Sequence, residues 1–157
     1  MTQNISKSGI AVKGVWKRTI TRADGSVEEV IIDNIVTANG LNLLASRAIS
    51  NTNTFFNHLA VGTVTAAASL GSTEFGEVSR KVPTTITSST EVFYAVATWG
   101  GFADSVTSLV LGSAAITNHV NSGQGTICNI VNGLSATLAN SDFLRLEVQV
   151  QIGSHNL

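Results

Sequence analysis

The stretch that decides the fold class is residues 143–152, Phe-Leu-Arg-Leu-Glu-Val-Gln-Val-Gln-Ile. From Leu144 to Ile152 every second residue is apolar, and the residues between are Arg, Glu or Gln. Successive side chains of a β-strand point to opposite faces, so this alternation predicts a strand with one buried and one wet face. A slip of one residue would place Arg145 and Glu147 in the core, so the register is strongly specified. The other segments of the chain must therefore build the sheet that receives this strand.

Upstream segments supply partners for this strand. Strands are predicted over 10–22 and 27–36, and between them Asp24-Gly25 is a dipeptide typical of tight hairpin turns. Pairing of the two strands brings basic residues close to acidic ones, which predicts cross-strand ion pairs on a solvated face. The basic residues are Lys17, Arg18 and Arg22, and the acidic residues are Glu28, Glu29 and Asp33.

The remaining chain predicts more short strands and one helix. In 37–50 apolar residues recur at spacings of three and four, which predicts a helix with an apolar stripe that includes Leu41, capped by Thr37 or Asn39. Residues 73–81 are polar and predict a helical turn. Further strands are expected over 57–63, 82–88, 91–99, 106–111 and 126–131, with turns at 121–125 and 132–133.

These elements predict a mainly β protein. Many short strands, frequent turns and one helix indicate a two-sheet antiparallel β-sandwich, jelly-roll-like or immunoglobulin-like, with one short helix near residues 38–50. The expected organisation is a polar N-terminal arm over 1–9 and a single β-sandwich domain over 10–157.

Composition excludes several classes of function. The chain has 157 residues and a net charge of −1, so no strong field attracts nucleic acid or an anionic membrane. No apolar run approaches the roughly 18 residues that would cross a bilayer. The first eight residues lack the apolar core of a signal peptide, and the lone Cys128 excludes an intrachain disulfide. Synthesis in the cytoplasm is therefore expected.

Charge is unevenly distributed along the chain. From Val92 to Ser141 the only charged side chain is Asp104. One interpretation is a surface that associates with other subunits, because the cores of protein interfaces are depleted of charge. The other is a buried half of the sandwich with loops rich in Ser and Thr. The sequence leaves both open.

The sequence offers little for catalysis. His58, His119 and His155 lack the spacing and nearby carboxylates of a helical zinc site, and no Gly-x-Ser-x-Gly motif is present. His58 lies in a predicted strand, where a hydrogen-bonded core or interface histidine is expected. Cys128 lies between apolar strand residues, which favours an inert buried thiol. We therefore expect no catalytic, metal-binding or cofactor-binding residues, and a protein that is not an enzyme.

Two segments are candidates for interaction with a partner. Trp99 and Phe102 flank two glycines, and aromatic faces beside a turn are typical platforms for sugars or proteins. The alternative is that both rings close the end of the core. The N-terminal arm, with Asn4, Ile5 and Lys7, either frays or orders on a neighbouring subunit.

Several segments resemble small virion proteins of tailed bacteriophages. Residues 33–44, Asp-Asn-Ile-Val-Thr-Ala-Asn-Gly-Leu-Asn-Leu-Leu, are similar to the family's N-x-V-T-N-x-G-L-N-x-L segment. Residues 56–63, Phe-Asn-His-Leu-Ala-Val-Gly-Thr, are similar to its I-x-H-I-A-V-G-T-G strand. Residues 66–71 stand where the family has an Ala- and Pro-rich loop, and residues 77–81 stand where it has an L-G-x-E-x-x-R segment. Residues 140–152 resemble the family's C-terminal segment, which begins S-D-x-L. The family's proline after Ala67 and its second glycine after Thr63 are missing here.

The resemblance runs from about Gly14 to Ile152 and implies a non-enzymatic component of a virus particle. Two functions compete. The first is a capsid decoration or cement protein that forms a trimer or dimer and clamps neighbouring subunits of the major capsid protein. The alternative is a tail-fibre or baseplate component that contacts the host surface, with a glycan as a partner under this alternative alone. Both place the protein in the virion, with no nucleic acid or membrane as partner.

Overall fold

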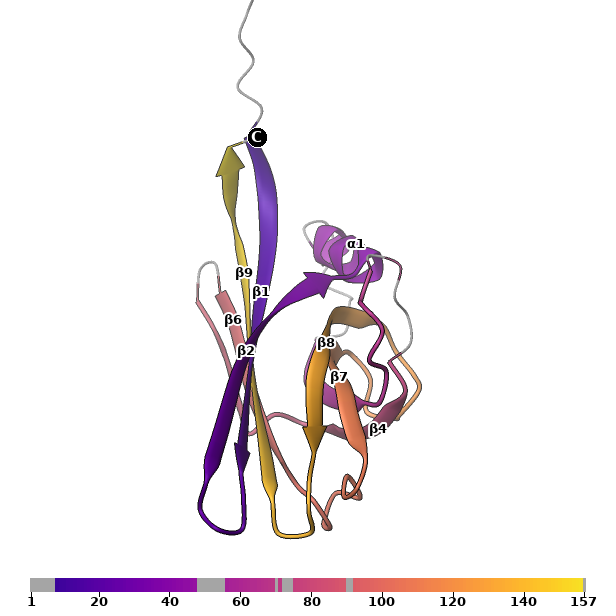
Figure 1. Cartoon of the computed structure of the whole chain (residues 1–157). Helices are drawn as coiled ribbons and strands as arrows, with labels where there is room; N and C mark the ends of the chain where they lie inside the picture. The colour runs from indigo at the N-terminus through magenta and orange to yellow at the C-terminus, as the bar shows by residue number, and fades with distance from the viewer. Residues whose placement is uncertain (1–7, 48–55, 70, 72–74, 90–91, 157) are drawn as a thin grey trace, which may run out of the picture.

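The computed structural model describes residues 8–47, 56–69, 71, 75–89 and 92–156 (Figure 1). These residues form nine strands and one helix. The elements are β1 (Ser8–Thr21), β2 (Val27–Val36), α1 (Ala38–Arg47), β3 (His58–Gly62), β4 (Glu77–Lys81), β5 (Thr85–Ser88), β6 (Val92–Gly100), β7 (Val110–Thr117), β8 (Ile127–Thr137) and β9 (Phe143–Asn156).

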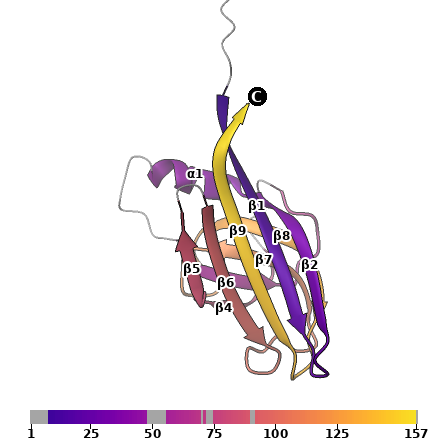
Figure 2. The same cartoon turned by 90° about the vertical axis from the view of Figure 1, so that its left-hand side faces the viewer.

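The strands form two antiparallel sheets that pack against each other, which confirms the predicted β-sandwich with one short helix. Sheet A has the order β2-β1-β9-β6-β5, and sheet B has the order β4-β3-β7-β8 (Figures 1 and 2). β2 belongs to both sheets. It pairs with β1 up to Asn34, opposite Gly14, and its last residues Ile35 and Val36 pair with β8. One continuous chain of hydrogen-bonded strands therefore links the two layers.

The strand that decided the fold class lies in the middle of sheet A. β9 pairs with β1 along its whole length, from Thr21 opposite Phe143 to Ser8 opposite Asn156. The predicted alternation is confirmed, because Leu144, Leu146 and Val148 are fully buried. The strand is longer than predicted, since it continues past Ile152 to Asn156.

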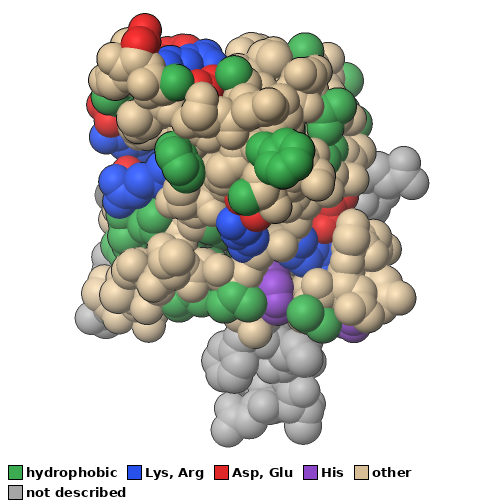
Figure 3. All heavy atoms as spheres, turned by 90° about the horizontal axis from the view of Figure 1, so that it is seen from below, with side chains coloured by type: hydrophobic (Ala, Val, Ile, Leu, Met, Phe, Trp, Pro, Cys, Tyr) green, Lys and Arg blue, Asp and Glu red, His purple; other side chains and the backbone are tan. Residues whose placement is uncertain are grey.

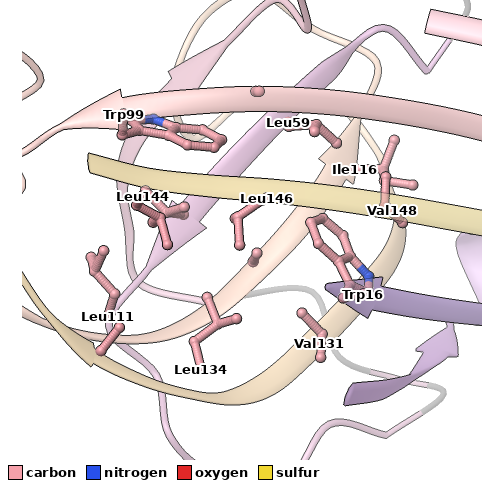
Figure 4. Close-up of a cluster of buried hydrophobic side chains, with 14 of the residues drawn as sticks. Trp16, Leu59, Trp99, Leu111, Ile116, Val131, Leu134, Leu144, Leu146 and Val148 are labelled. Carbon is pink, nitrogen blue, oxygen red and sulfur yellow. The ribbon is translucent and has the colours of Figure 1, made fainter. Parts of the chain in front are cut away.

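The core lies between the sheets and contains both tryptophans (Figure 4). Trp16 on β1 is fully buried, and its indole Nε1 donates a hydrogen bond to Asn129 Oδ1 on β8 over 2.8 Å. This bond gives the one polar atom of a large apolar side chain a partner inside the core. Other fully or almost fully buried core residues are Leu59, Trp99, Leu111, Ile116, Val131, Leu134, Leu144, Leu146 and Val148.

A second, smaller core covers the outer face of sheet B. Ala60, Phe75, Ala115 and Ile130 form it beneath the segment that links β3 to β4. The hydroxyl of Ser113 donates to the carbonyl oxygen of Phe75 over 2.8 Å and holds this segment against β7. Every residue of β7 after the first is buried as a result.

Helix α1 packs beside this second core, against β8. Thr37 caps the helix as predicted, because its Oγ1 accepts a hydrogen bond from the Gly40 amide over 3.0 Å. The Thr37 amide donates to the carbonyl oxygen of Cys128 over 3.0 Å. Leu41 differs from the prediction: it is 39% exposed and does not lie in a buried stripe. The other residues of the predicted stripe lie outside the residues whose side chains the structure describes.

Three local predictions were wrong. Residues 77–81, expected in a helical turn, form strand β4. The strand expected over 106–111 begins only at Val110, because the preceding residues form turns in which Ser105 and Ser108 have positive φ. Asn132-Gly133 does not end a strand. It lies inside β8 at a bulge, where Gly133 has φ 91° and the register with β7 shifts.

Candidate interaction surfaces

A two-stranded ribbon projects from the body of the molecule (Figure 1), and Val12 at its base packs against the main core. It consists of 8–12 of β1 and 152–156 of β9, which pair with each other from Ser8 opposite Asn156 to Val12 opposite Ile152. The neighbouring strands stop earlier, since β6 begins opposite Gln151 and β2 pairs with β1 no further than Gly14. We call this segment the ribbon. It rises from the same end of the body at which α1 lies (Figure 2).

The last two residues of the predicted arm belong to this ribbon. Asn4, Ile5 and Lys7, the candidate contact residues of the arm, are outside the described part of the chain. Ser8 and Gly9, the last residues of the predicted arm, belong to β1 and pair with Asn156 and His155. The ordered strand therefore starts earlier than the expected domain boundary at residue 10.

The aromatic patch predicted at Trp99 and Phe102 is not formed. Trp99 is fully buried, and its Nε1 donates to Ser79 Oγ on β4 over 3.1 Å, so it has no face to offer a ligand. Phe102 is 76% exposed and does not close the core as the alternative interpretation expected. The two residues separate because Trp99 points inward from β6, whereas Phe102 lies in the turn that follows Gly100 and Gly101.

The nearly uncharged stretch from Val92 to Ser141 combines buried strands with exposed loops. It contains β6, β7 and β8, and it supplies most of the buried residues of sheet B. Its one charge, Asp104, forms an ion pair with Lys81 over 2.7 Å. Burial accounts for the missing charges in the strands, whereas residues 120–125 and 139–141 are exposed and equally uncharged.

Sheet A, by contrast, has an outer face that no element of the described chain covers (Figure 2). This face carries charged pairs, among them Lys17 with Glu29 over 2.7 Å and Arg145 with Glu147 over 3.3 Å. Ile31, which is 70% exposed, lies beside Lys17 on this face.

The end of the molecule opposite the ribbon carries further exposed apolar side chains, those of Val27, Phe102, Val110 and Phe143. Seen from that end, hydrophobic side chains form several separate areas among polar atoms (Figure 3). No single apolar patch stands out on this face.

Cross-strand ion pairs of the predicted kind join β1 to β2, and they also anchor the β8–β9 turn. The guanidinium of Arg18 is buried, however, and does not lie on a solvated face as predicted. Arg18 pairs with Glu28, and its guanidinium donates to the carbonyl oxygen of Leu134. Burial, reinforced by the nearby Arg22, lowers the pKa of Arg18. Arg22 pairs with Asp142 over 2.7 Å. These charges hold two hairpins together and are not free for a ligand.

A hollow of about 310 Å³ lies at the edge of sheet B, beside β4. Its charged lining is one ion pair: Arg80 Nε and Nη2 both bond Glu77 at 2.7 Å, and both side chains are less than 10% exposed. Arg80 also donates to the carbonyl oxygens of His119 and Gln124, and the Gly123 amide donates to Glu77 over 3.1 Å. The pair therefore anchors the β7–β8 loop, and every charged atom in it already has a partner.

Two further residues were candidates for chemistry. His58 is buried as predicted, with Nδ1 2.7 Å from Asn57 Oδ1, and burial together with Arg80 and His119 lowers its pKa. Cys128 is buried as predicted, and burial raises the pKa of its thiol to about 12. Such a thiol is almost entirely protonated at neutral pH and is a poor nucleophile.

The part of the chain that the structure describes contains neither a metal-binding cluster nor a membrane-spanning helix. No group of three or more His, Cys, Asp or Glu side chains there could hold a metal ion. The described helix is too short to cross a membrane. No family model, curated protein or solved structure matches this chain.

Proposed function

We propose that this protein is a non-enzymatic structural component of a bacteriophage virion, a capsid decoration or cement protein that oligomerises and clamps neighbouring subunits of the major capsid protein. The observation that carries the proposal is the ribbon. Its five residue pairs extend about 17 Å, at roughly 3.4 Å per residue, beyond the strands that flank it. A compact body with a projecting ribbon is suited to span the gap between two neighbouring proteins.

The use of charged groups inside the body supports a structural role. The Arg22–Asp142 pair fastens the β1–β2 hairpin to the β8–β9 turn. Arg18 and Arg80, each in an ion pair, also donate to backbone carbonyl oxygens of another hairpin or loop. Their guanidinium and carboxylate groups are engaged with protein partners, whereas catalytic groups need access to a substrate.

The family resemblance over Gly14 to Ile152 supports the virion location. In a shell built from many symmetric copies, each contact can be weak, because linked contacts act together. The partners under this proposal are further copies of this chain and the major capsid protein.

Analysis of purified particles tests the proposal. We expect a copy number that scales with the capsid subunits, and particles without the protein should lose their genome at lower temperature while they still adsorb to host cells. A copy number of a few per particle, located at the tail tip, would overturn the proposal. Deletion of residues 1–7 separately tests the arm, since loss of capsid attachment is expected only if the arm makes part of the clamp.

The competing function is a tail-fibre or baseplate protein that contacts a host glycan. Burial of Trp99 removes half of the patch on which this alternative was based, and Phe102 remains as one exposed ring. A glycan array distinguishes the two functions. Binding that is abolished by Phe102→Ala and retained by Val120→Ala, another exposed residue, would favour the tail location.

A further inference from the structure

The ribbon has two strand edges with no neighbour among the described residues. On one side, β6 pairs with β9 only as far as Val92 opposite Gln151. On the other side, β2 leaves β1 at Gly14 and passes to β8. At every second residue of 8–12 and 152–156 the backbone N–H and C=O groups therefore point away from the paired strand, a ready template for another strand.

The strands at the two ends of the sheet order, β4 and β5, are protected against such pairing. β4 carries Glu77, Arg80 and Lys81 within five residues. β5 is only four residues long and follows Pro83 by two positions. Charges, proline and short length are the usual means by which proteins prevent pairing at an edge. The ribbon has neither charge nor proline to prevent it: 8–12 and 152–156 contain no Asp, Glu, Lys, Arg or Pro.

A two-stranded ribbon is also marginally stable in water, and a third strand is normally needed to stabilise it. We infer that the ribbon is a self-association site, at which the free edge of β9 over 152–156 pairs with the same edge of a second copy. The inference deepens the proposed function, because it names the contact through which the copies would associate.

The β9 edge is favoured over the β1 edge by what lies beside each. On the side of β1, sheet A continues into β2, which pairs with β1 up to Asn34. On the side of β9, an added strand would continue the line of β6 and extend sheet A in its existing order. β6 begins directly after its turn from β5, in which the Ser89 amide donates a hydrogen bond to the carbonyl oxygen of Val92 over 2.9 Å.

A second copy fits this edge because the edge is complementary to itself. Two identical edges related by a two-fold axis run antiparallel, so that each donor on one copy can face an acceptor on the other. The uncharged sequence brings no like charges together. The contact is small, and we therefore expect weak association in solution that multivalent display on a shell would strengthen.

Gly153 gives a direct test. It lies on β9 opposite Ala11, and a Cβ at this position would meet no atom within 4 Å, so the monomer should accept a side chain there. Gly153→Lys places a positive charge on each ribbon close to the two-fold axis. In sedimentation equilibrium at low salt, we expect the wild type to form a dimer and Gly153→Lys to raise its dissociation constant at least tenfold, as like charges in close contact repel.

Gly153→Ala is the matched control, since it adds a Cβ without charge and should leave the dissociation constant within about twofold. A mixture of Gly153→Lys and Gly153→Asp should recover the dimer, because the two ribbons then carry opposite charges. Hydrogen exchange of the wild type gives an independent readout that needs no variant. Amides of 152–156 should become more protected as protein concentration rises.

Three results would overturn the inference: a wild-type monomer at millimolar concentration, a trimer, or a Gly153→Lys dimer as tight as the wild type at low salt. These outcomes differ from failure of the proposed function. Monomeric protein that still attaches to capsids would reject ribbon pairing alone. A ribbon-dependent dimer that is absent from capsids would reject the proposed function alone.

Discussion

The two sheets share one core but differ in what covers their outer faces. The middle of sheet B is buried on both sides, by sheet A on one and by the segment around Phe75 on the other. Sheet A is covered on its inner side only, and its outer face carries charged residues such as Lys17, Glu29 and Arg145. A sheet buried on both faces needs apolar residues at successive positions, whereas a half-exposed sheet alternates.

This difference explains part of the distribution of charge along the chain. β7 and the first half of β8 carry no charge because they lie where sheet B is covered on both faces. The loops of the same stretch are exposed and uncharged, so burial does not explain them. Sheet A and the ribbon that extends it are the exposed surfaces at which association is tested.

The largest effect is expected where the second core covers sheet B. Phe75 is only 4% exposed, so Phe75→Ala should lower the free energy of unfolding by about 3–5 kcal/mol through lost burial and a new cavity. Phe102→Ala deletes the same atoms from a side chain that is 76% exposed, and it should cost at most about 0.5 kcal/mol. Urea unfolding measures both. Equal effects would show that the outer face of sheet B is not a second core.

The contact between α1 and β8 can be tested at Gly40. A Cβ there would lie 2.1 Å from the carbonyl oxygen of Cys128, so Gly40→Ala must displace the helix from the strand. We expect this overpacking to lower the free energy of unfolding by about 1–3 kcal/mol. A Gly→Ala substitution inside a helix without such a contact raises the free energy of unfolding by about 1 kcal/mol. The sign of the change in the free energy of unfolding therefore shows whether α1 packs this closely against β8. Gly71→Ala, where a Cβ meets no atom within 4 Å, serves as the control in thermal unfolding.

A smaller effect, dependent on pH, is expected at Asp142. Its carboxylate accepts hydrogen bonds from the amides of Ala139 and Ala23 and pairs with Arg22. The Ala139 amide, followed by Arg22, lowers the pKa of Asp142. Asp142→Asn should lower the free energy of unfolding by roughly 1–2 kcal/mol at pH 7, because it weakens hydrogen bonds to a charged group.

The sign of the pH dependence follows from the direction of this shift. A carboxyl group with a lower pKa in the folded state stabilises the fold above its unfolded pKa of about 3.9, and the stabilisation is lost as the pH falls through the folded value. The difference in stability between wild type and Asp142→Asn should therefore shrink below about pH 4. Asp33→Asn, at an exposed position on β2, provides the control. A difference that does not begin to shrink as the pH falls below about 4 would contradict the assignment.

Much of the fold could be predicted from the sequence, because sheet A follows local rules. Alternation in β9 and the Asp24-Gly25 turn each depend on residues close in sequence, and Gly25 has the positive φ, 83°, that such a turn requires. Sheet B was harder to predict. Glu77 and Arg80 resemble a helical ion pair by spacing, but pairing of β4 with β3 makes the segment a strand. Gly133 forms a bulge and not a turn because β7 pairs on both sides of it.

The candidate surfaces were predicted less well, for a related reason. Whether an aromatic residue faces the core depends on the partner of its strand: Trp99 is buried because Leu144 pairs with it on a core-facing position of β9. Phe102, three residues later, has left that strand. The ribbon was not predicted, since the sequence past Ile152 no longer alternates, and its pairing with the N-terminal end of β1 spans almost the whole chain.

The smallest effect is expected on the open face of sheet A, at Ile31. Ile31 is 70% exposed, so Ile31→Lys should change the free energy of unfolding by no more than about 0.5 kcal/mol. The same variant separates the open face of sheet A from the ribbon as the site of association. Pairing at the β9 edge predicts an unchanged dissociation constant in sedimentation equilibrium, because Ile31 lies on β2, two strands away from β9. Loss of the dimer in Ile31→Lys, with Gly153→Lys unaffected, would instead place the contact on the face of sheet A.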